Sequence, residues 1–337
     1  MTRSRLFETF LKTAERELQT HAAGLSSNPA YGIDAQICVR VDETAEATAF
    51  VRWNFEDSCY DIILTLGLCV WAFEVAAIVA AHVDRDPDES SALNLDFSNY
   101  QYLSRKQIED RIEAAAQLFP DNQKAYCEYV FGGMLLAVFQ HEVAHIVSGH
   151  INYLKSISNN VASIDELHIL TLSQPQRGDV PPLFFEYEAD HVGSQLLAEA
   201  ATSSAPPLSR WANGSRRDNM LFGLFGFTVF TLALEEAARL RDVKAPGYPS
   251  PMLRFSVAIT GAKRIWDEER TGEEFLNAIM IPLGQILTLF ETIYPAVGFL
   301  RDFTDPDWQK SLESEIDAML NECSPYIERV GQFSLFR

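Results

Sequence analysis

The sequence predicts an α+β, mostly helical fold with a small N-terminal sheet, and three observations support this prediction. Three early segments, at 35–41, 48–55 and 60–66, alternate in polarity or are rich in β-branched and aromatic residues, which is typical of strands. From residue 104 onward, apolar residues recur at helical spacing. A long apolar helix in the middle of the chain contains an HExxH motif at residues 141–145.

The N-terminal region is expected to hold one amphipathic helix, three strands and an apolar helix. The helix covers residues 1–24, and the strands at 35–41 and 48–55 are expected to pair as a hairpin. The third strand, at 60–66, precedes an apolar helix that ends near residue 82. Periodicity alone does not separate a strand from a helix at 60–66, and a strand is predicted there.

The rest of the chain is predicted to be helical. An amphipathic helix at 104–118 ends before Pro120, and the next begins near residue 121 and runs through the HExxH motif to about residue 156. Further helices are expected near 184–200, 219–242, 251–268 and 307–323, with a broken apolar run at 275–300. Three regions, 1–118, 119–200 and 201–337, are expected to form one compact unit.

Composition excludes some functions and compartments. The chain has 27 basic and 47 acidic side chains and a net charge of −20, which repels phosphate backbones, so no nucleic-acid partner is expected. Its five cysteines include no CxxC pair, which argues against a disulfide framework or a thiolate zinc site. The N-terminus lacks the apolar core of a signal peptide, and a cytoplasmic location is predicted.

Three apolar segments raise the question of membrane insertion. They are 62–83, 220–234 and 279–300. The second is shorter than a spanning helix, the third is interrupted by prolines and polar residues, and Glu74 within the first would be costly in lipid. Buried helices of a large core are therefore favoured, and membrane association is the disfavoured alternative.

The HExxH motif places two potential metal ligands on one helix face. Each helical residue advances about 100°, so His145 lies about 40° from His141 and one turn along, and both rings can reach one metal ion. Glu142 lies about 100° round, from where its carboxylate can take a proton from a water at the metal. This is the geometry of a zinc hydrolase. The alternative is a core helix whose histidines bond to backbone groups.

A third ligand is expected downstream rather than from His150. His150 follows His141 by nine residues and, on a continuous helix, faces about 180° away, so at most a structural role or a role behind a metal ligand is expected for it. Glu186 and Asp190 share a helix face at i, i+4 spacing, so that Glu186 can be a metal ligand and Asp190 can accept a hydrogen bond from a ligand histidine. Glu188 is expected to point to the opposite side.

The two-part pattern, HExxH followed by Glu186-Tyr-Glu-Ala-Asp190, resembles that of zincin metallopeptidases with a glutamate ligand. It is similar to the HtpX-like and CAAX-processing peptidases, and its context also resembles the Lit-type phage-exclusion peptidases. The resemblance implies a zincin-like core, Zn²⁺ bound by His141, His145 and Glu186, and Glu142 as general base. It also implies cleavage of peptide bonds in a protein or peptide substrate.

A further fragment, at 248–254, resembles the HP-x-x-x-x-R segment of the same enzymes. Tyr248 stands where the family has histidine, and a phenol can still donate to an oxyanion, while Arg254 matches the arginine. The alternative is that the prolines of this segment simply start the next helix. By analogy with other zincins, strand 60–66 would be the edge strand along which an extended substrate lies.

Two other functions use the same residues. Paired ExxH motifs and two more glutamates in apolar helices would make a di-iron carboxylate site from Glu142, His145, Glu188, His191, Glu74 and Glu235, but this leaves His141 unexplained. Alternatively, the chain is a non-catalytic zincin-fold binding module. An intact Glu142 argues against that, because a scaffold does not need a general base.

Overall fold

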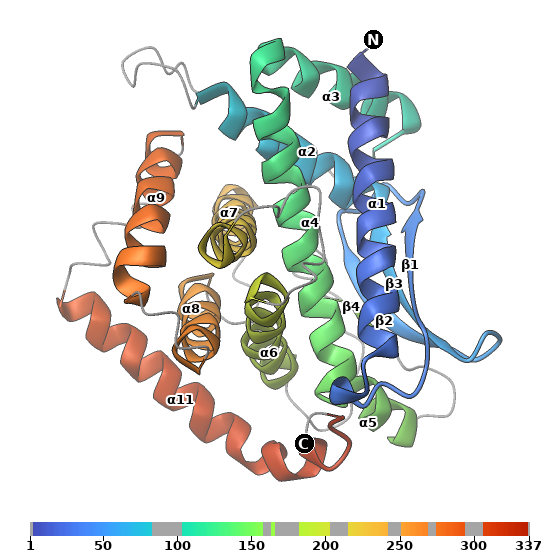
Figure 1. Ribbon diagram of the computed structural model, residues 1–337, viewed down its shortest axis with the longest axis vertical. Coiled ribbons are helices and arrows are strands. Elements are labelled where there is room, and N and C mark those ends of the chain that lie inside the picture. The colour runs from blue at the N-terminus through green and yellow to red at the C-terminus, as the bar shows by residue number, and fades with distance from the viewer. Residues whose placement is uncertain are drawn as a thin grey trace.

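The computed structural model describes residues 3–82, 103–157, 163–165, 182–202, 215–241, 251–268, 274–293 and 306–335. In these ranges the protein has a mostly helical α+β fold with a small sheet, as the sequence predicts. A long helix, α4 (Lys124–Val147), runs through the centre (Figure 1). On one side of it lie the sheet and α1 (Arg3–Ser27), and on the other lie α6 (Pro182–Thr202), α7 (Arg216–Arg241) and α8 (Pro251–Glu268).

The sheet has the strand order β1-β3-β2-β4. β1 (Ile37–Asp42) pairs in parallel with β3 (Cys59–Thr65), and β2 (Ala49–Asn54) pairs antiparallel with both β3 and β4 (Ser163–Asp165). The expected hairpin between the first two strands is therefore wrong, because the hairpin joins β2 to β3. The fourth strand was not predicted from the sequence.

The assignment of strand 60–66 as the edge strand is also wrong, because β3 lies at the centre of the sheet. All seven of its residues are buried, which is typical of a strand with neighbours on both edges and cover on both faces. The edge strands of the described sheet are β1 and β4. Helix α1 covers the outer edge of β1, where the side chains of Gln19 and Ser26 accept hydrogen bonds of 2.9 Å from the backbone N–H groups of Val39 and Ile37.

Most of the predicted helices are present, with shifted ends. Ser104 caps the N-terminus of helix α3 (Arg105–Leu118) and forms a capping box with Gln107. Helix α8 has the predicted bounds. The broken apolar run forms a π-helical turn (Leu276–Met280) and α9 (Ile281–Ile293), and α11 (Pro306–Gly331) extends beyond its predicted end. Short 3₁₀ turns lie at Pro29–Tyr31 and Asp121–Gln123.

The first two apolar segments are buried where they are described, with residues 62–65 in β3, whereas the third is only partly buried, because Ile281 of α9 is 55% exposed. Residues 67–82 of α2 (Leu66–His82) are all buried, and Glu74 among them forms a 3.2 Å ion pair with Arg111 of α3. Within the described ranges one helical stretch, Asp121–Val147, is long and apolar enough to cross a membrane. Its most apolar part is wholly buried inside the protein. A buried core helix satisfies the same criteria.

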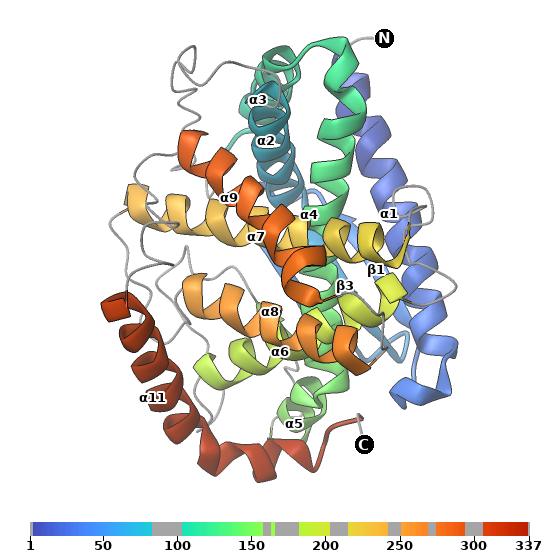
Figure 2. The same cartoon turned by 60° about the vertical axis from the view of Figure 1, so that its left-hand side comes forward.

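Helices α6, α7 and α8 run across α4 (Figure 2), and glycines allow them to approach closely. A Cβ on Gly226 of α7 would lie 2.1 Å from the backbone of Gly133 in α4, and one on Gly193 of α6 would lie 3.1 Å from the Cα of His141. A Cβ on Gly261 of α8 would lie 2.3 Å from Ser194 Oγ on α6. These contacts fix the distances between the backbones of α4 and α7, of α4 and α6, and of α6 and α8.

Helix α4 does not continue to residue 156, as the sequence had suggested. It ends at Val147, and Gly149 adopts a left-handed φ of 80° before α5 (His150–Ile157) begins. The C-terminal segment lies against this break, where the Leu335 N–H donates to the carbonyl of Val147 at 2.8 Å. A Cβ on Gly149 would lie 2.3 Å from the carbonyl of Phe333, so both the conformation and the contact require glycine.

The contact between Gly133 and Gly226 gives a prediction about stability. Replacing Gly226 with Ala forces α4 and α7 apart, and we expect a loss of about 1–3 kcal/mol or more in the free energy of unfolding, measured by urea denaturation. Gly284→Ala in α9 is the control, because a Cβ there meets nothing within 4 Å. Because alanine has a higher helix propensity than glycine, this variant should be as stable as wild type or more stable by up to about 1 kcal/mol. Equal effects in the two variants would contradict the packing argument.

The burial of His21 is expected to make the folded protein less stable at low pH. His21 lies on α1 against the Phe139 ring, its Nε2 accepts a 2.6 Å hydrogen bond from the Gln140 amide, and burial lowers its pKa from 6.5 to about 4. As the pH falls, His21 is protonated in the unfolded chain before it is protonated in the folded protein. The contribution of His21 to the free energy of unfolding is therefore fully present above pH 6.5 and is lost as the pH falls toward 4. In urea unfolding at pH 7 and pH 4.5, wild type should lose on the order of 2 kcal/mol more than His21→Leu. Parallel losses would show that His21 is not responsible.

Candidate metal centre

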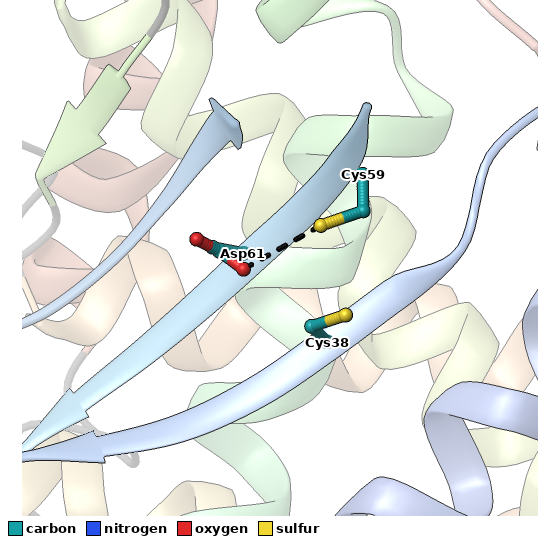
Figure 3. Close-up of side chains that lie close together, drawn as sticks. All are labelled: Cys38, Cys59 and Asp61. Carbon is teal, nitrogen blue, oxygen red and sulfur yellow. Dashed lines mark hydrogen bonds between the residues drawn. The ribbon is translucent and has the colours of Figure 1, made fainter. Parts of the chain in front are cut away.

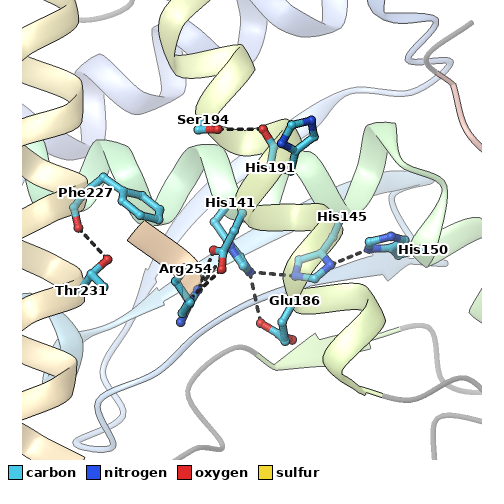
Figure 4. Close-up of polar contacts among 10 residues, drawn as sticks. His141, His145, His150, Glu186, His191, Ser194, Phe227, Thr231 and Arg254 are labelled. Atoms are coloured by element: carbon cyan, nitrogen blue, oxygen red, sulfur yellow. Dashed lines mark hydrogen bonds and ion pairs between the residues drawn. The ribbon is translucent and has the colours of Figure 1, made fainter. Parts of the chain in front are cut away.

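Two histidines of α4 and one glutamate of α6 meet in the interior (Figure 4). The Nε2 atoms of His141 and His145 lie 3.0 Å apart, and Glu186 Oε2 lies 3.3 Å from His141 Nε2. All three side chains are buried, and their ligand atoms lie within 4.8 Å of one another. The structure thus brings together the three residues that the sequence predicted as metal ligands.

His141 is held from behind by a buried ion pair. Its Nδ1 lies 2.8 Å from Asp190 Oδ1, and Arg254 of α8 donates to the same carboxylate through Nε at 2.7 Å and Nη2 at 2.8 Å. Burial by itself raises the pKa of Asp190, but the Arg254 charge and the hydrogen bond from His141 outweigh it and lower that pKa. The ionised carboxylate only accepts, so Nδ1 carries the proton and the lone pair of Nε2 faces Glu186 and His145.

The three converging atoms fit a metal ion. A tetrahedral zinc with ligand bonds of about 2.0–2.1 Å separates its ligand atoms by roughly 3.3 Å. The observed separations are 3.0 Å for the two Nε2 atoms and 3.3 Å for His141 Nε2 and Glu186 Oε2. A lone pair on Nε2 beside a carboxylate oxygen, away from water, is repulsive without a cation between them. A buried metal-binding group is therefore what this arrangement can form, and two imidazoles with a carboxylate suit zinc and other divalent transition metals.

Glu142 lies on α4 directly after the first ligand and is fully buried. Helix geometry puts it about 100° round from His141, beside the ligands. A carboxylate at this position can exchange protons with a molecule held at the metal. Its assignment as general base remains a prediction at this point.

The opposite side of His145 has partners that the sequence did not predict. His145 Nδ1 lies 2.8 Å from His150 Nδ1, and His150 Nε2 lies 2.8 Å from Glu188 Oε2. His150 was expected to point away from the ligands because one continuous helix was predicted through residue 156. Glu188 was expected to do so because it lies on a different face of its own helix from Glu186. Gly149, a residue typical of the position just after a helix end, was the available signal that His150 starts a new turn.

Two predicted residues of the 248–254 segment have different outcomes. Arg254 is buried and donates to Asp190, which in turn contacts His141. Tyr248 lies outside the described residues, and its proposed donation to an oxyanion stays a prediction. The catalytic part of this segment is therefore untested, while its arginine forms part of the support for His141.

A second group, Cys38, Cys59 and Asp61, lies on the sheet (Figure 3), with ligand atoms within 4.8 Å of one another. Burial, together with Cys38 and Asp61, raises the pKa of the Cys59 thiol to about 12. The Asp61 carboxylate already pairs with Arg40 at 3.2 Å and Arg52 at 3.5 Å. Two guanidinium groups and a protonated thiol disfavour a cation here, so we assign this group to a structural ion-pair network.

The described residues do not assemble the alternative di-iron site. Neither of the two groups that could hold a metal in these ranges contains Glu74 or His191. Glu74 pairs with Arg111. His191 points away from the cluster (Figure 4). Its Nε2 lies 3.0 Å from the side-chain amide of Gln195. The side chain of Glu235 lies outside the described residues.

No protein-family model, no curated protein and no solved structure matches the chain. A functional assignment therefore depends on the chemistry of the metal-binding group itself.

The cluster predicts how metal content responds to substitution. Purified wild type should contain one metal ion per chain by elemental analysis, and Glu186→Ala should lose it or bind it much more weakly, because one of three protein ligands is gone. Cys59→Ser is the matched control and should keep full metal content. Full metal content in Glu186→Ala would show that another residue is the third ligand. Two irons per chain in wild type would favour the di-iron alternative.

Proposed function

We propose that this protein is a zinc-dependent endopeptidase. The observation that supports this most directly is that His141, His145 and Glu186 converge in the interior while Glu142 lies beside them on the same helix. A metal site that served only stability would need the ligands but not an additional buried carboxylate next to them. Burying that carboxylate is costly, which favours a chemical role.

Zinc is proposed because of the donor set and the resemblance noted for the HExxH and Glu186–Asp190 motifs. Two neutral imidazoles and one carboxylate, with room left for a fourth ligand, are typical of catalytic zinc sites. When bound, zinc would acidify a water and polarise a scissile carbonyl.

The protein groups have separate tasks in this proposal. Glu142 accepts the proton of the attacking water and passes it to the nitrogen of the leaving amine, so that one carboxylate serves first as base and then as acid. Asp190, held by Arg254, keeps His141 in one orientation and one tautomer. The burial of the three ligands limits competing water and strengthens each electrostatic contact.

The substrate class and location are part of the same proposal. We propose a protein or peptide substrate in the cytoplasm, and the net charge of −20 argues against nucleic acid as a partner. The central helix α4 is apolar enough for a membrane but is buried among α2, α6 and α7, which favours a core helix over an inserted one.

The general base gives the decisive test. Glu142→Gln should keep its metal, because the ligands are intact, while hydrolysis of a fluorescently labelled, unfolded casein should fall at least about 10²-fold. Glu128→Gln, on the same helix α4, is the control and should keep wild-type activity.

Two other results would redirect the assignment. Metal-loaded wild type that cleaves neither casein nor a diverse peptide mixture, analysed by mass spectrometry, would favour the binding-module alternative. Equal activity in Glu142→Gln and wild type would contradict the role of Glu142 as general base.

A further inference from the structure

We propose that Glu188 and His150 are positioning residues that fix the tautomer and orientation of His145. The three side chains form a chain of contacts that leads from α6 to the metal-binding group. Glu188 Oε2 lies 2.8 Å from His150 Nε2, and His150 Nδ1 lies 2.8 Å from His145 Nδ1. This proposal rests on the metal site proposed above and goes beyond its ligands and general base.

The direction of the protons follows from the carboxylate at the far end. The Glu188 carboxylate oxygen accepts in this contact, so Nε2 of His150 donates to it. In a neutral imidazole the other nitrogen then accepts, so Nδ1 of His145 must be the donor in the second contact. The lone pair of His145 is thereby placed on Nε2, which faces His141 Nε2 at 3.0 Å. The chain of contacts leaves His145 in the tautomer that binds a metal through Nε2.

His150 is itself held rigidly, which is required of a residue that orients another. It is fully buried, and its ring lies edge-on to the Phe185 ring at a centroid distance of 4.8 Å. Its backbone position is set by the left-handed turn at Gly149, against which the carbonyl of Phe333 packs. This turn brings His150 back towards His145, which a straight continuation of α4 would not do.

Helix α6 then supplies a carboxylate to each part of the site. Glu186 faces the two Nε2 atoms, Asp190 lies behind His141, and Glu188 acts behind His145 through His150. Glu188 is on a different face of α6 from the other two, and the imidazole of His150 spans the remaining distance. Each ligand histidine is thus held by a carboxylate, directly for His141 and through His150 for His145. Loss of such hydrogen-bond partners typically weakens metal binding by about 10- to 100-fold.

The experiment measures zinc affinity by competition with a chromophoric chelator, without any substrate. His150→Phe and Glu188→Leu should bind zinc about 10- to 100-fold more weakly than wild type. Glu188→Gln should retain most of the affinity, because its amide oxygen can still accept from His150 Nε2. His191→Phe, a histidine of α6 that points away from the cluster, is the matched control and should bind as wild type. Unchanged affinity in both His150→Phe and Glu188→Leu would overturn the proposal.

A second readout separates positioning from general stability. In metal-free protein, ¹⁵N NMR of the imidazoles should show His145 protonated on Nδ1 in wild type and in Glu188→Gln, and should show loss of this single tautomer in His150→Phe. Wild-type His145 protonated on Nε2 would overturn the proposal. Wild type that binds no zinc would remove the proposed peptidase function, while the tautomer measurement would still decide the role of His150 and Glu188.

Discussion

The close approach of α6 to α4 is the constraint on which the candidate site depends. Gly193 brings the backbone of α6 to the Cα of His141, and this contact sets how far Glu186 must reach to meet the two imidazoles. On its other side α6 is pressed by Gly261 of α8. A side chain at either glycine would push the two packed helices apart, because a close-packed interior has no room for it. The polar side chains that meet between these helices would then no longer reach one another.

The buried pair of Asp190 and Arg254 links that packing to the electrostatics. A carboxylate in this interior is expensive unless it is paired, and Arg254 compensates it with two donated hydrogen bonds while His141 supplies a third contact. The same pair joins α8 to α6 and contacts a potential metal ligand, His141, on α4. Structural and chemical roles therefore coincide at Asp190, and the lowering of its pKa expresses how strongly its surroundings favour the charged form.

Two groups of potential ligands illustrate why proximity alone does not make a metal site. The Cys38, Cys59 and Asp61 group is as closely spaced as the histidine group, yet Arg40 and Arg52 already neutralise its carboxylate. Around His141 and His145, by contrast, Asp190 lies at the far nitrogen of His141, and Glu188 contacts the far nitrogen of His145 through His150. The sign of the charge behind the ligands, rather than their number, separates a site that attracts a cation from one that is already satisfied.

The sequence alone determined those features that depend on local periodicity. Helical spacing put His141 and His145 on one face of one helix, and Glu186 and Asp190 on one face of a second helix. Residue patterns also located three strands and the helix at 251–268. The order of the strands, the end of α4 at Val147 and the contact of His150 with Glu188 were decided only by tertiary structure. Each of these depends on segments far apart in the chain, such as Phe333 against Gly149 or β3 between β1 and β2. Periodicity specifies which face of an element is buried, whereas the partner that covers that face is selected by packing across the whole core.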